Sequence, residues 1–167
     1  DLYLRLVNTS VGRTAAQSLG LPAPAPLKRL KRADQPFIEG KVLIGAANGG
    51  KAIATLGSIL GASAATLHHA SESNRLADSS KAGNKARPLD LASDINQQFS
   101  ALVFDATGLK GPADLRALYD FFHPTIKKLG SNARVLVIGQ NPASCRKAPQ
   151  AAAQRALEGF VRSLRVP

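Results

Sequence analysis

Short runs of consecutive apolar residues alternate with amphipathic stretches along most of the chain. The apolar runs are residues 41–45 (KVLIG), 101–104 (ALVF) and 133–138 (ARVLVI). Each is followed by a segment in which apolar residues recur every three or four positions, over residues 50–61, 111–130 and 149–164. Strands that are apolar throughout, rather than at alternate residues, are covered on both faces, as in parallel sheets. The pattern therefore predicts an α/β fold with helices on both sides of a parallel sheet.

Weaker signals complete this picture. Two further strands are predicted over residues 63–69 (SAATLHH) and 86–91 (ARPLDL), and a short helix over residues 92–99 (ASDINQQF). Residues 70–87 are rich in Ser, Asn, Lys and Ala and contain few large apolar residues, so they are expected to form a surface segment.

Residues 1–36 form an N-terminal arm of different character. They begin with the apolar LYLRLV, continue with a helical pattern over residues 13–20, and carry prolines at positions 22, 24, 26 and 36. Proline interrupts regular structure, because its ring fixes φ and removes an N–H donor. We therefore expect a short helical and proline-rich arm, followed by a main domain over residues 37–167.

Composition limits the classes of protein. The 167 residues, 44% of them apolar, suit a single core. The one cysteine, Cys145, can form no internal disulfide, and no Cys/His spacing resembles a zinc site. No apolar run approaches the roughly 20 residues that span a bilayer, and no signal-peptide pattern opens the chain. These features favour a soluble protein in a reducing, cytoplasmic setting.

Positive charge dominates, with a formal net charge of +11. Such a surplus favours anionic partners. The densest cluster lies in the arm and consists of Lys28, Arg29, Lys31 and Arg32. It lacks the interleaved aromatic residues and motifs of nucleic-acid-binding proteins, so we expect neither specific nucleic-acid binding nor a membrane partner. The cluster is interpreted either as a solvated basic face or as a docking site for an acidic protein.

A glycine-rich loop follows the first strong strand and contains Gly45, Asn48, Gly49 and Lys51. In parallel α/β sheets such a turn binds phosphate, because the first N–H groups of the next helix are free and its dipole is positive there. The spacing fails G-x-G-x-x-G, and Ala52 stands where a P-loop has Ser or Thr. Two interpretations therefore stay open: a nucleotide-phosphate site, or glycines that permit tight packing.

Four stretches resemble motifs of the short-chain dehydrogenase/reductase family, in the family's order. VLIGAANGG resembles its TGxxxGxG opening, ALVFDATG its DVLVNNAG strand, ARVLVIGQ its GRIVNISS strand, and AAAQRALEGFVRSL its YxxxKaaleGftrsLa helix. The likeness covers roughly residues 38–164. With the arm, it is similar to the N-terminal, degenerate Rossmann or flavodoxin-like domain of long 3-oxoacyl-acyl-carrier-protein reductases. The resemblance implies a parent protein that reduces 3-oxoacyl thioesters of fatty-acid metabolism with NAD(P)H.

The same resemblance implies that this chain has lost the family's chemistry. The family's active tyrosine falls on Ala151, its lysine on Arg155 and its serine on Gln140. Alanine has no proton to give, and arginine cannot reproduce the point contact of an ammonium group. Lys51 replaces the third glycine of the phosphate loop, and Asp105 brings a carboxylate near the family's cofactor. The cofactor NAD(P)H is therefore assigned to the parent protein, and none is assured in this chain.

Other candidate residues receive structural interpretations. His68, His69 and His123 have no partners at metal-ligand spacing, so we expect them on the surface or in loops and predict no metal site. Cys145 precedes Arg146 and Lys147, which favour the thiolate, but a bystander thiol is the simpler interpretation. The resemblance places Asp90 at a family position near the adenine, and either a nucleotide contact or a structural role is open for it.

The leading hypothesis is a non-catalytic domain that acts as a docking or oligomerisation module. The last helix is the expected self-association surface, because its apolar residues exceed what one sheet face should absorb. The predicted interface consists of Ala152, Ala156, Leu157, Phe160, Val161 and Leu164. Two alternatives remain: a regulatory domain that binds a nucleotide or flavin phosphate, and an electrostatic docking site for acyl-carrier protein on the arm.

Overall fold

The chain divides into two compact units, Asp1–Gln35 and Pro36–Pro167, beside the predicted boundary after residue 36. The computed structural model describes residues 2–7, 9–21, 29, 31–70, 86–89 and 97–164.

The first unit contains two short helices, α1 (Leu2–Val7) and α2 (Ser10–Ser18). Thr9 joins them, because its Oγ1 donates to the Leu6 carbonyl at 2.7 Å and accepts from the Gly12 N–H at 3.1 Å. Val7 and Ala16 are buried between the helices. The helical arm predicted from the sequence is therefore present, and it begins with a helix where only an apolar start was expected.

A parallel sheet of five strands forms the centre of the second unit. The strands are β1 (Gly40–Ala46), β2 (Ala65–Ala70), β3 (Arg87–Leu89), β4 (Phe99–Asp105) and β5 (Leu129–Ile138), in the order β3-β2-β1-β4-β5. All neighbouring strands run parallel. The central strands are the apolar runs of the sequence, and Val42, Leu43 and Ile44 are fully buried. The predicted parallel α/β fold is thus confirmed.

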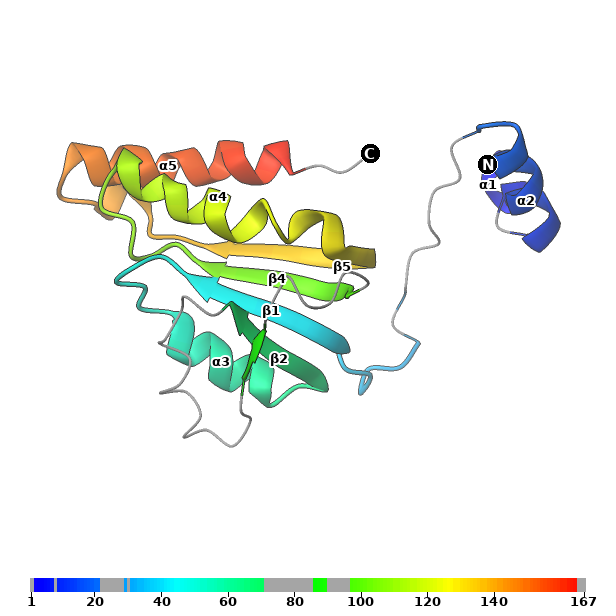
Figure 1. Ribbon diagram of the computed structural model, residues 1–167, viewed down its shortest axis with the longest axis horizontal. Coiled ribbons are helices and arrows are strands. Elements are labelled where there is room, and N and C mark those ends of the chain that lie inside the picture. The colour runs from blue at the N-terminus through cyan, green and yellow to red at the C-terminus, as the bar shows by residue number, and fades with distance from the viewer. Residues whose placement is uncertain are drawn as a thin grey trace. The chain divides into compact units, whose positions relative to one another are not determined.

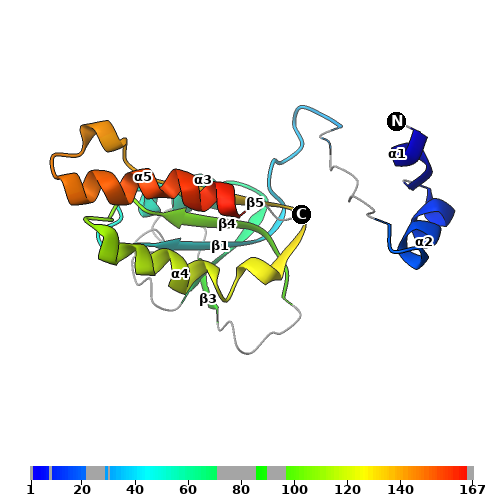
Figure 2. The ribbon, with the colours of Figure 1, turned by 90° about the horizontal axis from the view of Figure 1, so that it is seen from above.

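Helices cover both faces of this sheet (Figure 1). The helix α3 (Ile53–Gly61) lies on one face, whereas α4 (Arg116–Phe122) and α5 (Ala148–Ser163) lie side by side on the other (Figure 2). Each face has its own core, and Val42 and Ile44 pack toward α3 while Leu43 packs toward α4 and α5. The result is a three-layer, Rossmann-like sandwich.

The helix predicted over residues 111–130 is wrong in its extent. The chain instead forms a 3-10 turn (Pro112–Leu115), then α4, then a second 3-10 turn (Ile126–Lys128). Pro124 ends α4, because it has no N–H to continue the helical ladder and restricts the residue before it. β5 consequently begins at Leu129 rather than at residue 133.

The end of the short helix predicted over residues 92–99 is also wrong, since Phe99 begins β4. The rest of that prediction, over residues 92–96, and most of the predicted surface segment lie outside the described residues. Among the helices that are described, none is long and apolar enough to cross a membrane.

Candidate functional site

The glycine-rich loop lies at the carboxyl edge of the sheet, between β1 and α3, where the sequence placed it. Gly49 has a φ of +86°, which favours glycine. A Cβ on Gly45 would lie 2.5 Å from the Phe121 ring. Gly45 therefore lets α4 approach β1 closely, which is a packing role.

The carboxylate of Asp105, at the end of β4, fills the position that this loop surrounds. Asp105 is fully buried. Its Oδ2 accepts from the Ala52 N–H at 2.7 Å, and its Oδ1 accepts from the N–H and the Oγ1 of Thr107 at 2.9 and 2.6 Å. Ala52 immediately precedes α3, so the carboxylate occupies the helix N-terminus, where nucleotide-binding folds hold a phosphate.

The loop after β4 closes over the same position. A Cβ on Gly108 would lie 2.4 Å from the Asn48 carbonyl oxygen, 2.5 Å from the Gly50 nitrogen and 2.7 Å from the Gly49 carbonyl carbon. The Lys51 N–H donates to Thr107 Oγ1 at 2.8 Å. The two loops are thus in direct backbone contact, and the N–H groups of Lys51 and Ala52 both bond to residues of the β4 loop.

Hydrogen bonds of three glutamine side chains connect α5 to this edge; Gln150 and Gln154 lie in α5, and Gln140 follows β5. Gln154, 3% exposed, accepts from the Gln140 N–H at 2.8 Å through Oε1 and donates to the Ala106 carbonyl at 2.9 Å through Nε2. Gln140 donates to the Thr107 carbonyl at 2.5 Å, and Gln150 donates to Gln140 Oε1 at 3.3 Å. The amides therefore cross-link the ends of β4 and β5 and the first half of α5.

Sequence reasoning missed the role of Gln154 altogether. A signal for it exists, since Gln150 and Gln154 are four residues apart and border the apolar stripe that contains Ala153 and Leu157. The sequence correctly predicted that the carboxylate of Asp105 lies near the loop. Its hydrogen bond with the Ala52 N–H was not predicted, because the two residues are 53 positions apart in the chain.

The three positions that resemble the family's catalytic residues contain no acid–base pair. Ala151 is half-buried and Arg155 is exposed, with Arg155 paired to Glu158 at 3.4 Å. The side chain of Gln140 is bonded to Thr107 and to Gln150. Gln140 and Arg155 both line one groove of about 470 Å³ between the end of β5 and α5. Neither side chain can act as a general acid or base there, because an amide does not titrate and a guanidinium stays protonated.

Half of the predicted α5 interface is wrong, because its side chains face the sheet. Leu157 is 8% exposed, the Phe160 ring centroid lies 5.0 Å from that of Phe122, and Leu164 packs against the same core. The core therefore takes up Leu157, Phe160 and Leu164 of the apolar stripe. Exposed side chains remain at Ala152, Ala156 and Val161.

His68 and His69 lie in β2, and the prediction that they belong to the surface or to loops is wrong for His68, which is buried, whereas His69 is partly exposed. His68 is 9% exposed, and both of its ring nitrogens are buried and have no hydrogen-bond partner among the residues that the structure describes. Burial lowers the pKa of His68, and the positive charges of Lys41 and Arg87 and the neighbouring His69 lower it further. By contrast, His123 is exposed and stacks on Tyr119 with ring centroids 4.7 Å apart.

The lowered pKa of His68 predicts a pH-dependent stability. Because the folded state binds this proton more weakly than the unfolded state does, stability falls as the pH drops below the ordinary value of 6.5. His68→Leu is therefore expected to flatten the decrease of the unfolding free energy between neutral and mildly acidic pH. Urea unfolding at several pH values checks this, with His123→Leu as the matched control. Equal slopes for wild type and His68→Leu would refute the assignment.

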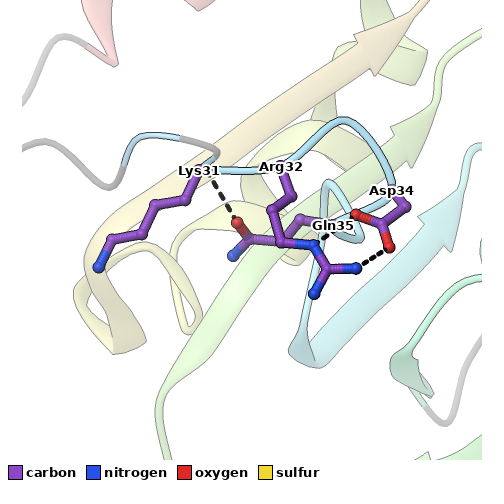
Figure 3. Close-up of polar contacts among 4 residues, drawn as sticks. All are labelled: Lys31, Arg32, Asp34 and Gln35. Carbon is purple, nitrogen blue, oxygen red and sulfur yellow. Dashed lines mark hydrogen bonds and ion pairs between the residues drawn. The ribbon is translucent and has the colours of Figure 1, made fainter.

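The basic arm carries less free charge than the sequence suggests (Figure 3). The Arg32 guanidinium bonds to both carboxylate oxygens of Asp34, at 3.0 and 2.5 Å. The backbone N–H of Lys31 donates to Gln35 Oε1 at 3.1 Å. The side-chain ammonium of Lys31 extends away from the other side chains drawn in Figure 3. Arg29 is exposed, whereas Lys28, like Asp90, lies outside the described residues.

Cys145 is half-buried after a 3-10 turn (Pro142–Ser144), with Sγ 3.6 Å from the Asn141 carbonyl oxygen. Within the described residues, no group of three His, Cys, Asp or Glu side chains could hold a metal ion.

No family model matches this chain, and a search of curated proteins gives no match.

Proposed function

We propose that this chain is a non-catalytic Rossmann-like domain of a 3-oxoacyl-acyl-carrier-protein reductase of the short-chain dehydrogenase/reductase type, and that it acts as a docking or oligomerisation module. One observation carries the proposal. The carboxyl edge of the sheet, where α/β proteins bind ligands, is filled by the chain's own Asp105 and glutamines. The partner surfaces must then lie elsewhere on the domain.

The filled edge argues against a nucleotide or flavin phosphate at the glycine loop. A phosphate at the head of α3 would meet the Asp105 carboxylate, and two negative charges about 4 Å apart repel by roughly 4 kcal/mol near a protein surface. It would also have to replace the bond between Asp105 and the Ala52 N–H. Lys51 offers an exposed ammonium, but its N–H already bonds to Thr107. NAD(P)H therefore belongs to the catalytic part of the parent protein.

The exposed side of α5 is the best candidate for self-association. Ala152, Ala156 and Gly159 are exposed and lie on one side of the helix, because residues three and four apart share a face. They are small, which allows two helices to approach closely. Gly159 lies in the same helix, and a Cβ there would meet no atom within 4 Å. A glycine inside a helix costs roughly 0.5–1 kcal/mol relative to alanine, and no packing of the described residues requires it.

Sedimentation of the chain tests this surface. We expect concentration-dependent self-association that Ala156→Asp abolishes, because a carboxylate would be desolvated between the helices. The matched control is Ala15→Asp, the same change at an exposed residue of α2. Phe160→Asp is unsuitable, because Phe160 packs against the core. A wild-type chain that stays monomeric, or an association that Ala156→Asp leaves unchanged, would contradict self-association through α5.

A further inference from the structure

The outer edge of the sheet, beside α5, is formed by β5. β5 is the last strand in the sheet order, and Arg134–Ile138 pair with β4 on one side and with no strand of the described residues on the other. The Ile138 carbonyl accepts from the Ala106 N–H, on the β4 side, at 2.7 Å. Because backbone groups alternate between the two edges of a strand, those of Val135 and Val137 face outward.

Beyond the charged Arg134, the last four residues of this edge lack the usual protection against pairing. Proteins shield an outer strand with charged residues, proline, a bulge or a covering element. Residues 135–138 (VLVI) contain neither a charge nor a proline, and the register shift between β4 and β5 lies earlier, between Phe99 and Ala101. Leu136 is 46% exposed. An apolar strand edge with outward-facing backbone groups is therefore available for a further strand.

A groove runs along the same edge and supplies the side-chain contacts. It is lined on the strand side by Val137 and Gly139 and on the α5 side by Leu157 and Val161. Its volume of about 470 Å³ falls within the range of ligand-binding clefts. An added strand would thus find backbone partners on β5 and an apolar wall on α5.

The charges around the groove select the partner. Arg155, Arg162 and Glu158 line it, and Glu158 pairs with Arg155 at 3.4 Å, so the lining keeps one net positive charge, near Arg162. Arg134, on the strand itself, donates to the Phe37 carbonyl at 2.6 Å. The whole chain carries a net charge of +11. A second copy would bring more positive charge to this edge, whereas an acidic segment is complementary to it.

We propose that the groove between β5 and α5 binds an extended acidic segment of a partner protein. The segment adds a strand to β5 and places carboxylates near Arg155 and Arg162 on the α5 side of the sheet. Its alternate, apolar side chains pack on Leu136, which points to the other side of the sheet. This inference deepens the proposed docking function and rests on it.

A labelled peptide of alternating Val and Glu, added to the full chain, tests the proposal by fluorescence anisotropy. We expect saturable binding that weakens with added salt. Methylation of alternate backbone nitrogens of the peptide should weaken binding roughly tenfold or more, because it removes the strand-pairing hydrogen bonds. A peptide with Lys in place of Glu should not bind.

Protein variants locate the site. Arg155→Glu combined with Arg162→Glu should weaken peptide binding roughly tenfold or more. Arg29→Glu combined with Lys31→Glu makes an equal charge change on the arm. This arm variant should bind the peptide more tightly than the groove variant, because it leaves the groove intact. The proposal is overturned if the Val/Glu peptide does not bind, if N-methylation of the peptide leaves binding unchanged, or if only the arm variant loses binding. A chain that self-associates through the Ala156 side of α5 but does not bind the peptide would leave the proposed function standing and remove this inference.

Discussion

Gly108→Ala is expected to destabilise the second unit by about 3 kcal/mol, at the upper end of the usual range for overpacking. The new methyl group would lie 2.4 Å from the Asn48 carbonyl oxygen and 2.5 Å from the Gly50 nitrogen. Both are backbone atoms of a turn that is held by the Gly50 N–H bond to the Ala47 carbonyl, at 2.9 Å. Neither atom can yield as the end of a flexible side chain would, so the two loops must separate.

Urea unfolding followed by circular dichroism measures this effect, since the chain has no tryptophan to report by fluorescence. The matched control is Gly159→Ala in α5, where the added methyl group meets no atom within 4 Å. That control should gain roughly 0.5–1 kcal/mol from helix propensity. Similar unfolding free energies for the two variants would show that the loops are not in close contact.

The strands and the long last helix could be predicted because their signals are local. The apolar runs KVLIG and ARVLVI are strands as predicted, and the periodic stretch over residues 149–164 became α5 with little change. Only the first run is covered on both faces, whereas ARVLVI is the outer strand and leaves Leu136 46% exposed. The break in the helix near residue 124 was also local, because a proline marks it, but the apolar period over residues 111–130 concealed it.

The site could be predicted only in part, because its contacts join distant residues. The loop of Gly45 to Lys51 was recognisable from its glycines. Its occupation by Asp105 depends on the pairing of β1 with β4, which sets Ala46 beside Asp105 and which no local pattern encodes. His68 illustrates the same limit, since a histidine in a weak strand pattern gives no sign of whether its face of the sheet is covered.

Asp105→Ala is expected to lower the unfolding free energy by about 3–5 kcal/mol. Each buried donor that loses its acceptor costs roughly 1–3 kcal/mol, and three donors bond to this carboxylate: the N–H of Ala52, the N–H of Thr107 and the hydroxyl of Thr107. Asp105→Asn should cost less, because the amide retains one acceptor oxygen. Asp120→Ala is the matched control. It removes a surface ion pair with Arg116, which contributes at most about 1 kcal/mol.

The central claim is that the carboxylate of Asp105, and not a nucleotide phosphate, holds the head of α3. The most direct test is urea unfolding of the wild-type chain, Asp105→Ala and Asp120→Ala, each with and without NADPH. The predicted result is a loss confined to Asp105→Ala and a wild-type unfolding free energy that NADPH does not change. A loss below about 1 kcal/mol in Asp105→Ala, or a wild-type chain that NADPH stabilises as a bound ligand must, would contradict the claim.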